Sequence, residues 1–325
     1  PMLPLQKDPS VIRKPQFARI EKVIPKSEWN VLQKEAKKKG ITTSTLLCTA
    51  YALVLGYWSN QPELTINVTV FTRYPFNEGV TDIVGDFTSV ILLRVNLLGR
   101  SDFWKLASEI QNQLMDALEH RHYDGMNVIR KIAEQAEMKE QAVMPVVFTS
   151  LLFSMEEGDI VTIEDLGEVK MGVSQTSQVY LDYQVMETKE GLLITWDYIK
   201  ELFTPNMIST MFKQYINIVE SLSKNVISMP HLDSKEQEVF TAYNDTKLDM
   251  PILPIQTTFK KIAEKYPEKI LIADNTGGVT CHQVDKQSSQ IANYLLNQKI
   301  KRGDVIAVLG NRRKETIINI LGILK

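Results

Sequence analysis

The sequence predicts an α/β fold, built as an α+β sandwich in which helices cover a mixed sheet, followed by a second, smaller α/β unit. Segments with the two-residue period of strands alternate with segments of helical period, and helices fall between strands that are not consecutive. A length of 325 residues exceeds the usual size of one domain. The apolar pattern also fades over residues 229–254, where turn formers and prolines replace it. We therefore expect a large unit over residues 1–228, a linker over 229–254 and a small unit over 255–325.

The large unit begins with a strand over residues 17–24 and a helix that Ser27 caps and Gly40 ends. The next helix, residues 43–58, is apolar on nearly every face, which indicates burial on all sides. The later helices repeat apolar residues at helical spacing or begin with proline, over residues 103–118, 126–135 and 205–223. The other strands alternate or form short apolar runs, over residues 64–70, 90–95, 145–153, 179–185 and 192–196.

The small unit repeats the alternation of helix and strand. Phe259, Ile262 and Ala263 mark an amphipathic helix, and the paired glycines at 277 and 278 predict a hairpin-like turn. The other expected elements are a strand over 270–273, a helix over 283–298, a strand over 305–309 and a helix over 313–324.

The composition of the chain indicates which partners and which cellular compartment to expect. The chain has 37 basic and 39 acidic residues in short clusters, so neither nucleic acid nor an anionic membrane is an expected partner. Cys48 and Cys281 lie far apart in unlike contexts, and we interpret them as packing residues in a reducing compartment. No apolar run approaches the roughly 20 residues of a membrane span, and no secretory leader opens the chain. We expect a cytoplasmic protein that binds small molecules or other proteins.

Four segments occur in an order and at a spacing that is typical of one enzyme family. They are LTINVTVFTRYPFNEGVTDIVGDFTS at 64–89, MPVVFTS at 144–150, SQTSQVYLDYQ at 174–184 and LLITWDYIKELF at 192–203. Together they resemble the C-terminal lobe of a heterocyclization domain, the variant of the condensation domain found in nonribosomal peptide synthetases. The resemblance implies one lobe of the chloramphenicol-acetyltransferase-like fold. It also implies a partner in the N-terminal lobe of the same domain, which PMLPLQKDP at the start of the chain would follow.

The small unit resembles the start of an adenylation domain of the acyl-CoA-synthetase-like superfamily, most clearly in residues 300–325. VTCHQV at 279–284 is a degenerate match to that family's Leu-Thr-Tyr-x-Glu-Leu motif. The Gly-rich phosphate loop of the family would lie beyond Lys325, so we expect ATP and Mg only in the complete adenylation domain. The resemblance implies further partners: the rest of that domain, and upstream and downstream peptidyl carrier proteins. The carriers, not this chain, would bear 4'-phosphopantetheine.

Cyclodehydration must move protons at a tetrahedral carbon, which suits a carboxylate beside a hydroxyl or an amide. A strand over residues 178–185 would place four polar side chains on one face, namely Gln178, Tyr180, Asp182 and Gln184. Thr149 lies in an apolar strand, where its hydroxyl requires a partner. By resemblance, Thr149 and Asp182 match the residues implicated in cyclodehydration. The family usually has His where this chain has Tyr183, which would face the opposite side of the sheet.

Each candidate residue also has a simpler explanation. Asp182 could be a solvated strand residue, and Thr149 a strand former bonded to the backbone. GDFTS, with Asp86 and Thr88, could be a turn into a strand or, by resemblance, a structural segment beside the substrate tunnel. Arg73 resembles a family arginine, although a surface salt bridge explains it slightly better. We expect Gln178 and Gln184 beside the tunnel, and Trp196 in the core.

Two other functions remain open from the sequence. The first is an ordinary condensation domain that forms amides only, and the second is a non-catalytic platform for carrier proteins. None of the histidines, His120, His122, His231 and His282, lies in the His-His-x-x-x-Asp-Gly motif of ordinary condensation domains. That motif and its heterocyclization counterpart belong to the first lobe, so they do not separate the alternatives. We expect no metal site, because His120 and His122 would point to different sides of a helix end.

Overall fold

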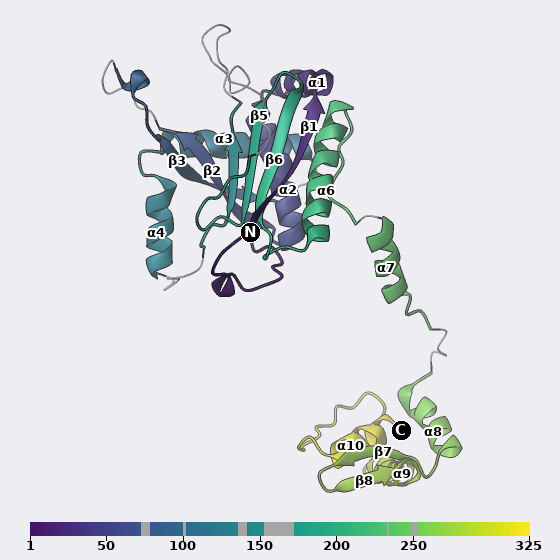
Figure 1. Cartoon of the computed structure of the whole chain (residues 1–325). Coiled ribbons are helices and arrows are strands. Elements are labelled where there is room, and N and C mark those ends of the chain that lie inside the picture. Colours follow the sequence, from purple (N-terminus) through teal and green to yellow (C-terminus); the bar gives the residue numbers. More distant parts are fainter. Residues whose placement is uncertain (73–78, 100–101, 136–141, 153–171, 233, 249–252) are drawn as a thin grey trace. The chain divides into compact units, whose positions relative to one another are not determined.

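The computed structural model describes residues 1–72, 79–99, 102–135, 142–152, 172–232, 234–248 and 253–325. These residues form two compact units, Pro1–Glu236 and Gln237–Lys325 (Figure 1). The boundaries predicted from the sequence stay a prediction. Residues 229–254 include the helix α7 (Ser234–Asn244), in which none of the described side chains is buried.

A six-stranded sheet organises the first unit, in the order β1-β6-β5-β4-β2-β3. Strand β4 runs parallel to both of its neighbours, and the other pairs are antiparallel, as a mixed sheet requires. The strands are β1 (Phe17–Pro25), β2 (Glu63–Phe71), β3 (Thr88–Asn96), β4 (Val146–Ser150), β5 (Leu181–Glu187) and β6 (Gly191–Ile199).

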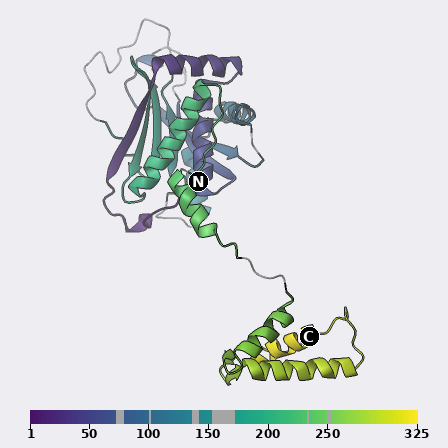
Figure 2. The same ribbon diagram turned by 90° about the vertical axis from the view of Figure 1, so that its right-hand side faces the viewer.

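One face of this sheet is covered by helices. The helices of the first unit are α1 (Lys26–Lys38), α2 (Thr43–Ser59), α3 (Phe103–Glu119), α4 (Gly125–Gln135) and α6 (Pro205–Ser223), with short 3₁₀ turns at Pro9–Val11 and Val80–Asp82. Figure 2 shows α2 and α6, which contact each other, on one side of the sheet. Every residue from 45 to 56 of α2 is buried, as its uniformly apolar sequence predicts. Cys48 and Trp196 are both buried here as expected.

The opposite face remains partly open, and α4 lies beside it. Helix α4 packs against β3, and its first residue, Gly125, lies so close to Val90 that a side chain would meet the Val90 carbonyl at 2.7 Å. Glycine therefore permits this approach. The arrangement leaves a polar surface over β2, β4 and β5, walled on one side by α4.

Some predicted boundaries were wrong for local reasons. Helix α1 begins at Lys26, and Pro25, not Ser27, is its N-cap residue. Strand β5 begins only at Leu181, because Gln178 has a left-handed backbone with a φ of 61° that interrupts an extended strand. Strand β4 ends at Ser150, and Phe153 lies outside the described residues.

The second unit has a small core of its own. It contains α8 (Ile255–Lys265), β7 (Ile270–Asp274), β8 (Gly277–Thr280), α9 (Cys281–Asn297) and α10 (Lys314–Leu324). Phe259, Cys281 and Val284 are buried together with Ile318 and Leu321. Helix α9 begins with a capping box, in which Thr280 and Gln283 bond each other's backbone amides.

The predicted strand over 305–309 is not formed. Val305 and Leu309 are 99% and 102% exposed, and the sheet of this unit is the β7–β8 hairpin alone among the described residues. An alternating sequence becomes a strand only when a neighbour completes its hydrogen bonds. The paired glycines begin β8, so the hairpin turn lies just before them.

Among the described residues, no single helix is long and apolar enough to cross a bilayer. Only α1 and α2 taken together pass that test, and the chain bends by 98° between them.

Candidate active site

A cavity of about 340 Å³ opens on the polar face of the sheet. Strands β2, β3, β4 and β5, helix α4 and the segment before β5 all contribute to it. Thr149 and Asp182 both line this cavity, together with Gln184. Asp182 is the only ionisable side chain among the described residues of the lining. Any acid–base chemistry supplied by these residues would therefore depend on Asp182.

Strand register explains why Thr149 and Asp182 share a face. Strands β4 and β5 are parallel neighbours in which Val147 pairs with Asp182 and Thr149 pairs with Gln184. Alternate residues of a strand point the same way, so these four side chains leave the same side of the sheet. The structure thus brings together two residues that lie on separate segments of the sequence.

The hydroxyl of Thr149 has the partner that its setting requires. It hydrogen-bonds the hydroxyl of Thr69 on β2 at 2.8 Å, and Thr69 also lines the cavity. Either oxygen can donate in this pair, so a proton can be offered in either direction. The alternative of a threonine bonded only to the backbone does not describe this site.

Asp182 is a buried carboxyl with spare hydrogen-bonding capacity. Its residue is 7% exposed, and its Oδ2 accepts a hydrogen bond from Gln184 Nε2 at 3.0 Å. Among the described residues, its Oδ1 has no hydrogen-bond partner. Burial raises the pKa of Asp182, and the charge of Asp197 adds to the rise, while Ser174, Gln184 and Arg19 act in the opposite direction. The surface-exposed alternative for Asp182 is therefore wrong.

Asn67 is a cavity residue that the sequence analysis did not single out. It is 5% exposed, and its Nδ2 donates to the Met144 carbonyl at 2.7 Å. That bond orients the amide and leaves Asn67 Oδ1 buried without a partner among the described residues. Asn67 pairs with Val147, which pairs with Asp182, so both free oxygens lie on one row of the sheet. The two residues thus line the cavity, and each has a buried oxygen whose hydrogen-bonding capacity is unused among the described residues. The sequence did contain a signal for Asn67, because apolar and polar residues alternate along this strand and Asn67 is one of the polar ones.

Next to Asp182, on the neighbouring strand β6, Asp197 forms an ion pair that was not predicted from the sequence. Asp197 on β6 accepts two hydrogen bonds from Arg19 on β1, from Nε at 2.8 Å and from Nη2 at 2.7 Å. Its Oδ2 also accepts the backbone N–H of Ser174 at 2.7 Å. The side chain of Asp197 is fully buried. Its only sequence signal is a carboxylate within an apolar strand, ITWDYI.

The remaining predicted residues have mixed outcomes. Gln178 lines the cavity from the turn before β5, and Thr88 lines it at the start of β3. Asp86 is exposed, and its Oδ1 accepts the Thr88 N–H at 2.8 Å, which is the hydrogen bond of a turn. The turn interpretation of GDFTS therefore describes the local structure. Arg73 lies outside the described residues.

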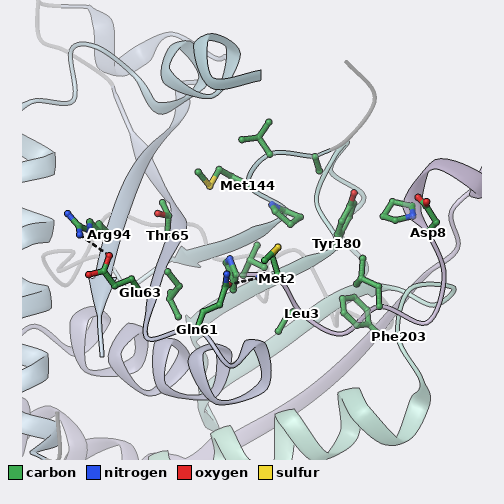
Figure 3. A pocket seen from close by; sticks show the side chains of 18 residues that line it. Met2, Leu3, Asp8, Gln61, Glu63, Thr65, Arg94, Met144, Tyr180 and Phe203 are labelled. Carbon is green, nitrogen blue, oxygen red and sulfur yellow. Dashed lines mark hydrogen bonds and ion pairs between the residues drawn. The ribbon is translucent and has the colours of Figure 1, made fainter. Parts of the chain in front are cut away.

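Tyr180 does not join the face of Asp182, contrary to the prediction. It precedes β5 and lines a second, larger cavity of about 730 Å³. Figure 3 shows this cavity, with Tyr180 and Phe203 near Asp8 and the Arg94–Glu63 ion pair on the far side. The period of a strand cannot be extended past its first residue, and Gln178 breaks it here.

Tyr183 does lie on the face opposite Asp182. Its hydroxyl hydrogen-bonds that of Tyr215 on α6 at 2.6 Å, and its ring stacks on Phe148 at 4.6 Å between centroids. The departure from the family's usual His therefore sits in the helix-covered core, away from the cavity.

The second unit contains a cavity whose lining does not suit a nucleotide. Its described cavity, of about 340 Å³ between α9 and α10, includes Glu315 and no basic side chain. Triphosphate binding requires backbone amides or cations around the phosphates. The residues present do not fit ATP, so no step of adenylation is assigned to them.

Two family models match the chain. Residues 1–248 match the Condensation domain family, and residues 259–325 match the AMP-binding enzyme family. Bacitracin synthase 1 of Bacillus licheniformis is 38% identical over 327 residues, covering 100% of this chain and 6% of that protein. Phenyloxazoline synthase MbtB of Mycobacterium tuberculosis is 31% identical over 297 residues, covering 89% of this chain and 21% of that protein.

The solved structures that resemble this chain also come from nonribosomal peptide synthetases. The cyclization-docking bidomain of the synthetase EpoB from Sorangium cellulosum is 32% identical with a TM-score of 0.62, over 69% of this chain and 45% of that one. The nonribosomal peptide synthetase FmoA3 is 27% identical with a TM-score of 0.72, over 95% of this chain and 33% of that one. The expected fold class is confirmed. The chain spans only a small part of these relatives, and it belongs to the condensation domain family, followed by the start of an AMP-binding domain, as part of a nonribosomal peptide synthetase.

Proposed function

We propose that the first unit is the C-terminal lobe of a heterocyclization domain, which joins two carrier-bound thioesters and then closes a Cys, Ser or Thr side chain into a thiazoline or oxazoline. The observation that carries this proposal is Asp182, a buried carboxyl with a free oxygen, in the same cavity as the Thr149–Thr69 hydroxyl pair. An exposed carboxylate or an isolated hydroxyl would not support it.

The reaction defines what these groups would do. After the amide bond forms, the side-chain thiol or hydroxyl attacks the amide carbonyl carbon and loses its proton, while the carbonyl oxygen gains one. The resulting hydroxyl then leaves as water, and the nitrogen loses its proton as the C=N bond forms. A carboxyl with a raised pKa is a stronger base than a free carboxylate, which suits a group that first accepts a proton and then donates it. Asp182 would exchange these protons, and Thr149 would orient the oxygen that leaves.

Two comparisons support cyclisation in particular. The name of MbtB specifies a phenyloxazoline product, and EpoB contributes a cyclization domain. The proposal also requires upstream and downstream carrier proteins that bear 4'-phosphopantetheine, the N-terminal lobe, and the rest of the adenylation domain with its ATP and Mg. A cytoplasmic location stays a prediction.

The test uses the full synthetase that contains this chain, with both carriers loaded. Asp182→Ala should lower the rate of cyclisation by about 10²–10⁴-fold, the usual contribution of a general acid–base, while amide formation continues. Released products would be separated by mass, because the uncyclised and cyclised forms differ by one water.

Matched variants sharpen this experiment. Asp116→Ala removes a carboxylate that is 77% exposed on α3 and should change neither step. Thr149→Val should accumulate the uncyclised product, and Thr149→Ser, which keeps the hydroxyl, should restore cyclisation. Equal loss of amide formation and cyclisation in Asp182→Ala would refute the assigned role. A wild-type enzyme that releases only uncyclised product would instead identify an ordinary condensation domain, and one that forms no amide would favour the carrier platform.

A further inference from the structure

We propose that Arg19 and Asp197 are positioning residues that set the proton affinity of Asp182 and hold the wall of its cavity in place. Neither residue lines the cavity, so both act through other residues. This inference rests on the proposed function of Asp182, and it adds residues from two further strands to the site.

The three side chains occupy one row across three neighbouring strands. Arg19 on β1 pairs with Asp197 on β6, and Asp197 pairs with Asp182 on β5. Directly opposed residues of antiparallel strands have Cβ atoms about 4.5–5.5 Å apart, and like charges in such positions repel. An ionised Asp197 therefore opposes the ionisation of Asp182, unless a cation compensates it.

The two carboxyls differ in their hydrogen bonds. Asp197 accepts three hydrogen bonds, two from the guanidinium of Arg19 and one from the Ser174 amide. The two-point contact with a guanidinium makes Asp197 the carboxylate of an ion pair. Asp182 accepts a hydrogen bond from Gln184, interacts with the Ser174 side chain, and keeps one oxygen without a partner among the described residues. When the environments of two adjacent carboxyls differ in this way, the less stabilised one is the group that exchanges protons.

Two other ionisable groups on the surrounding elements interact with Asp182 or with Arg19. Tyr51 on α2 interacts electrostatically with Asp182 from the opposite face of the sheet. Glu21, two residues further along β1, interacts with Arg19. The described residues that line the cavity from β2, β3, β4 and α4 carry no ionisable side chain. Asp197 and Arg19 are therefore the charges that distinguish Asp182 from an ordinary buried carboxyl.

The same ion pair anchors the cavity wall. The Ser174 amide donates to Asp197, and Ser174, Thr176 and Ser177 all line the cavity just before β5. Gly172 also approaches Arg19, since a side chain there would lie 3.1 Å from Nη1. The segment that carries these cavity residues is thus fastened to β1 and β6 through charged groups.

Opposite shifts in a pH profile test this role. In the full synthetase, the ratio of cyclised to uncyclised product would be measured against pH for wild type, Asp197→Asn and Arg19→Gln. Each profile has a midpoint, the pH at which the product ratio is half of its maximum. Loss of the Asp197 anion should move this midpoint to lower pH, and loss of the Arg19 cation should move it to higher pH. General damage to the structure would lower the ratio without separating the midpoints. Arg94→Gln removes the exposed Arg94–Glu63 pair of the same sheet and should leave the midpoint unchanged.

A double variant covers the case in which a single variant fails to fold. Removing one member of an ion pair leaves the other charge unpaired, which is costly, and the combined change Arg19→Gln with Asp197→Asn removes both charges of the pair. Because Asp197 lies directly opposite Asp182 and Arg19 lies one strand further away, the double variant should show a midpoint below that of wild type. Unchanged midpoints in variants that fold would overturn this inference alone. The proposed function would fail separately, if Asp182→Ala released no excess of uncyclised product.

Discussion

The two faces of strand β5 contrast sharply, although they are built from adjacent residues. Tyr183 is fully buried among rings, stacked on Phe148 and bonded to Tyr215, so each of its groups has a partner. Asp182 is nearly as buried but keeps an oxygen without a partner among the described residues. The two residues are thus similar in burial and differ in their polar atoms. The Tyr183 hydroxyl is hydrogen-bonded, whereas one oxygen of Asp182 is not.

The largest expected effect is a loss of stability on the aromatic face of β5, around Tyr183. Tyr183→Ala should lower the free energy of unfolding by about 3–5 kcal/mol, because it leaves a cavity among Tyr51, Phe148 and Tyr215. Tryptophan fluorescence during urea unfolding measures this effect in the first unit specifically, since Trp29, Trp58, Trp104 and Trp196 all lie there. Asp182→Ala is the matched comparison, and a larger loss in that variant would reverse the assignment of the two faces.

A smaller effect is expected from one hydroxyl on the same face. Tyr215→Phe removes the partner of the Tyr183 hydroxyl at 2.6 Å and leaves that group buried and unsatisfied. The free energy of unfolding should fall by about 1–3 kcal/mol. Tyr57→Phe, at an exposed tyrosine of α2, serves as the control. If both variants unfold alike, the hydroxyl pair contributes nothing to stability.

The smallest effect concerns Asp182 itself and has the opposite sign. Its pKa is raised in the folded state, mainly by burial, so at neutral pH the folded protein carries a carboxylate that is less favourable than in the unfolded chain. Asp182→Asn removes this penalty and should stabilise the first unit at pH 7. The gain should shrink as the pH falls toward 3.8, because the folded wild type then takes up the proton first. Urea unfolding at both pH values checks this, and a variant that is less stable at pH 7 would contradict it.

Much of this site follows from local periodicity. The alternation around Asp182 predicts that it shares a face with Gln184 and opposes Tyr183, and the structure agrees. That argument fails at Tyr180, because the left-handed backbone of Gln178 ends the strand before the period reaches it. The expected strand over 305–309 fails for a related reason, since a period describes side chains and provides no neighbouring strand.

Sequence alone therefore determined the family, the two α/β units, and Thr149 and Asp182 as the candidate pair. Only the tertiary structure decided which side chains surround that pair, namely Thr69, Asn67, Asp197 and Arg19. The physical reason is that periodicity is a property of one strand, whereas the cavity depends on pairing. Parallel β4 and β5 are joined through a long connection, and their register is set by contacts that no local pattern encodes.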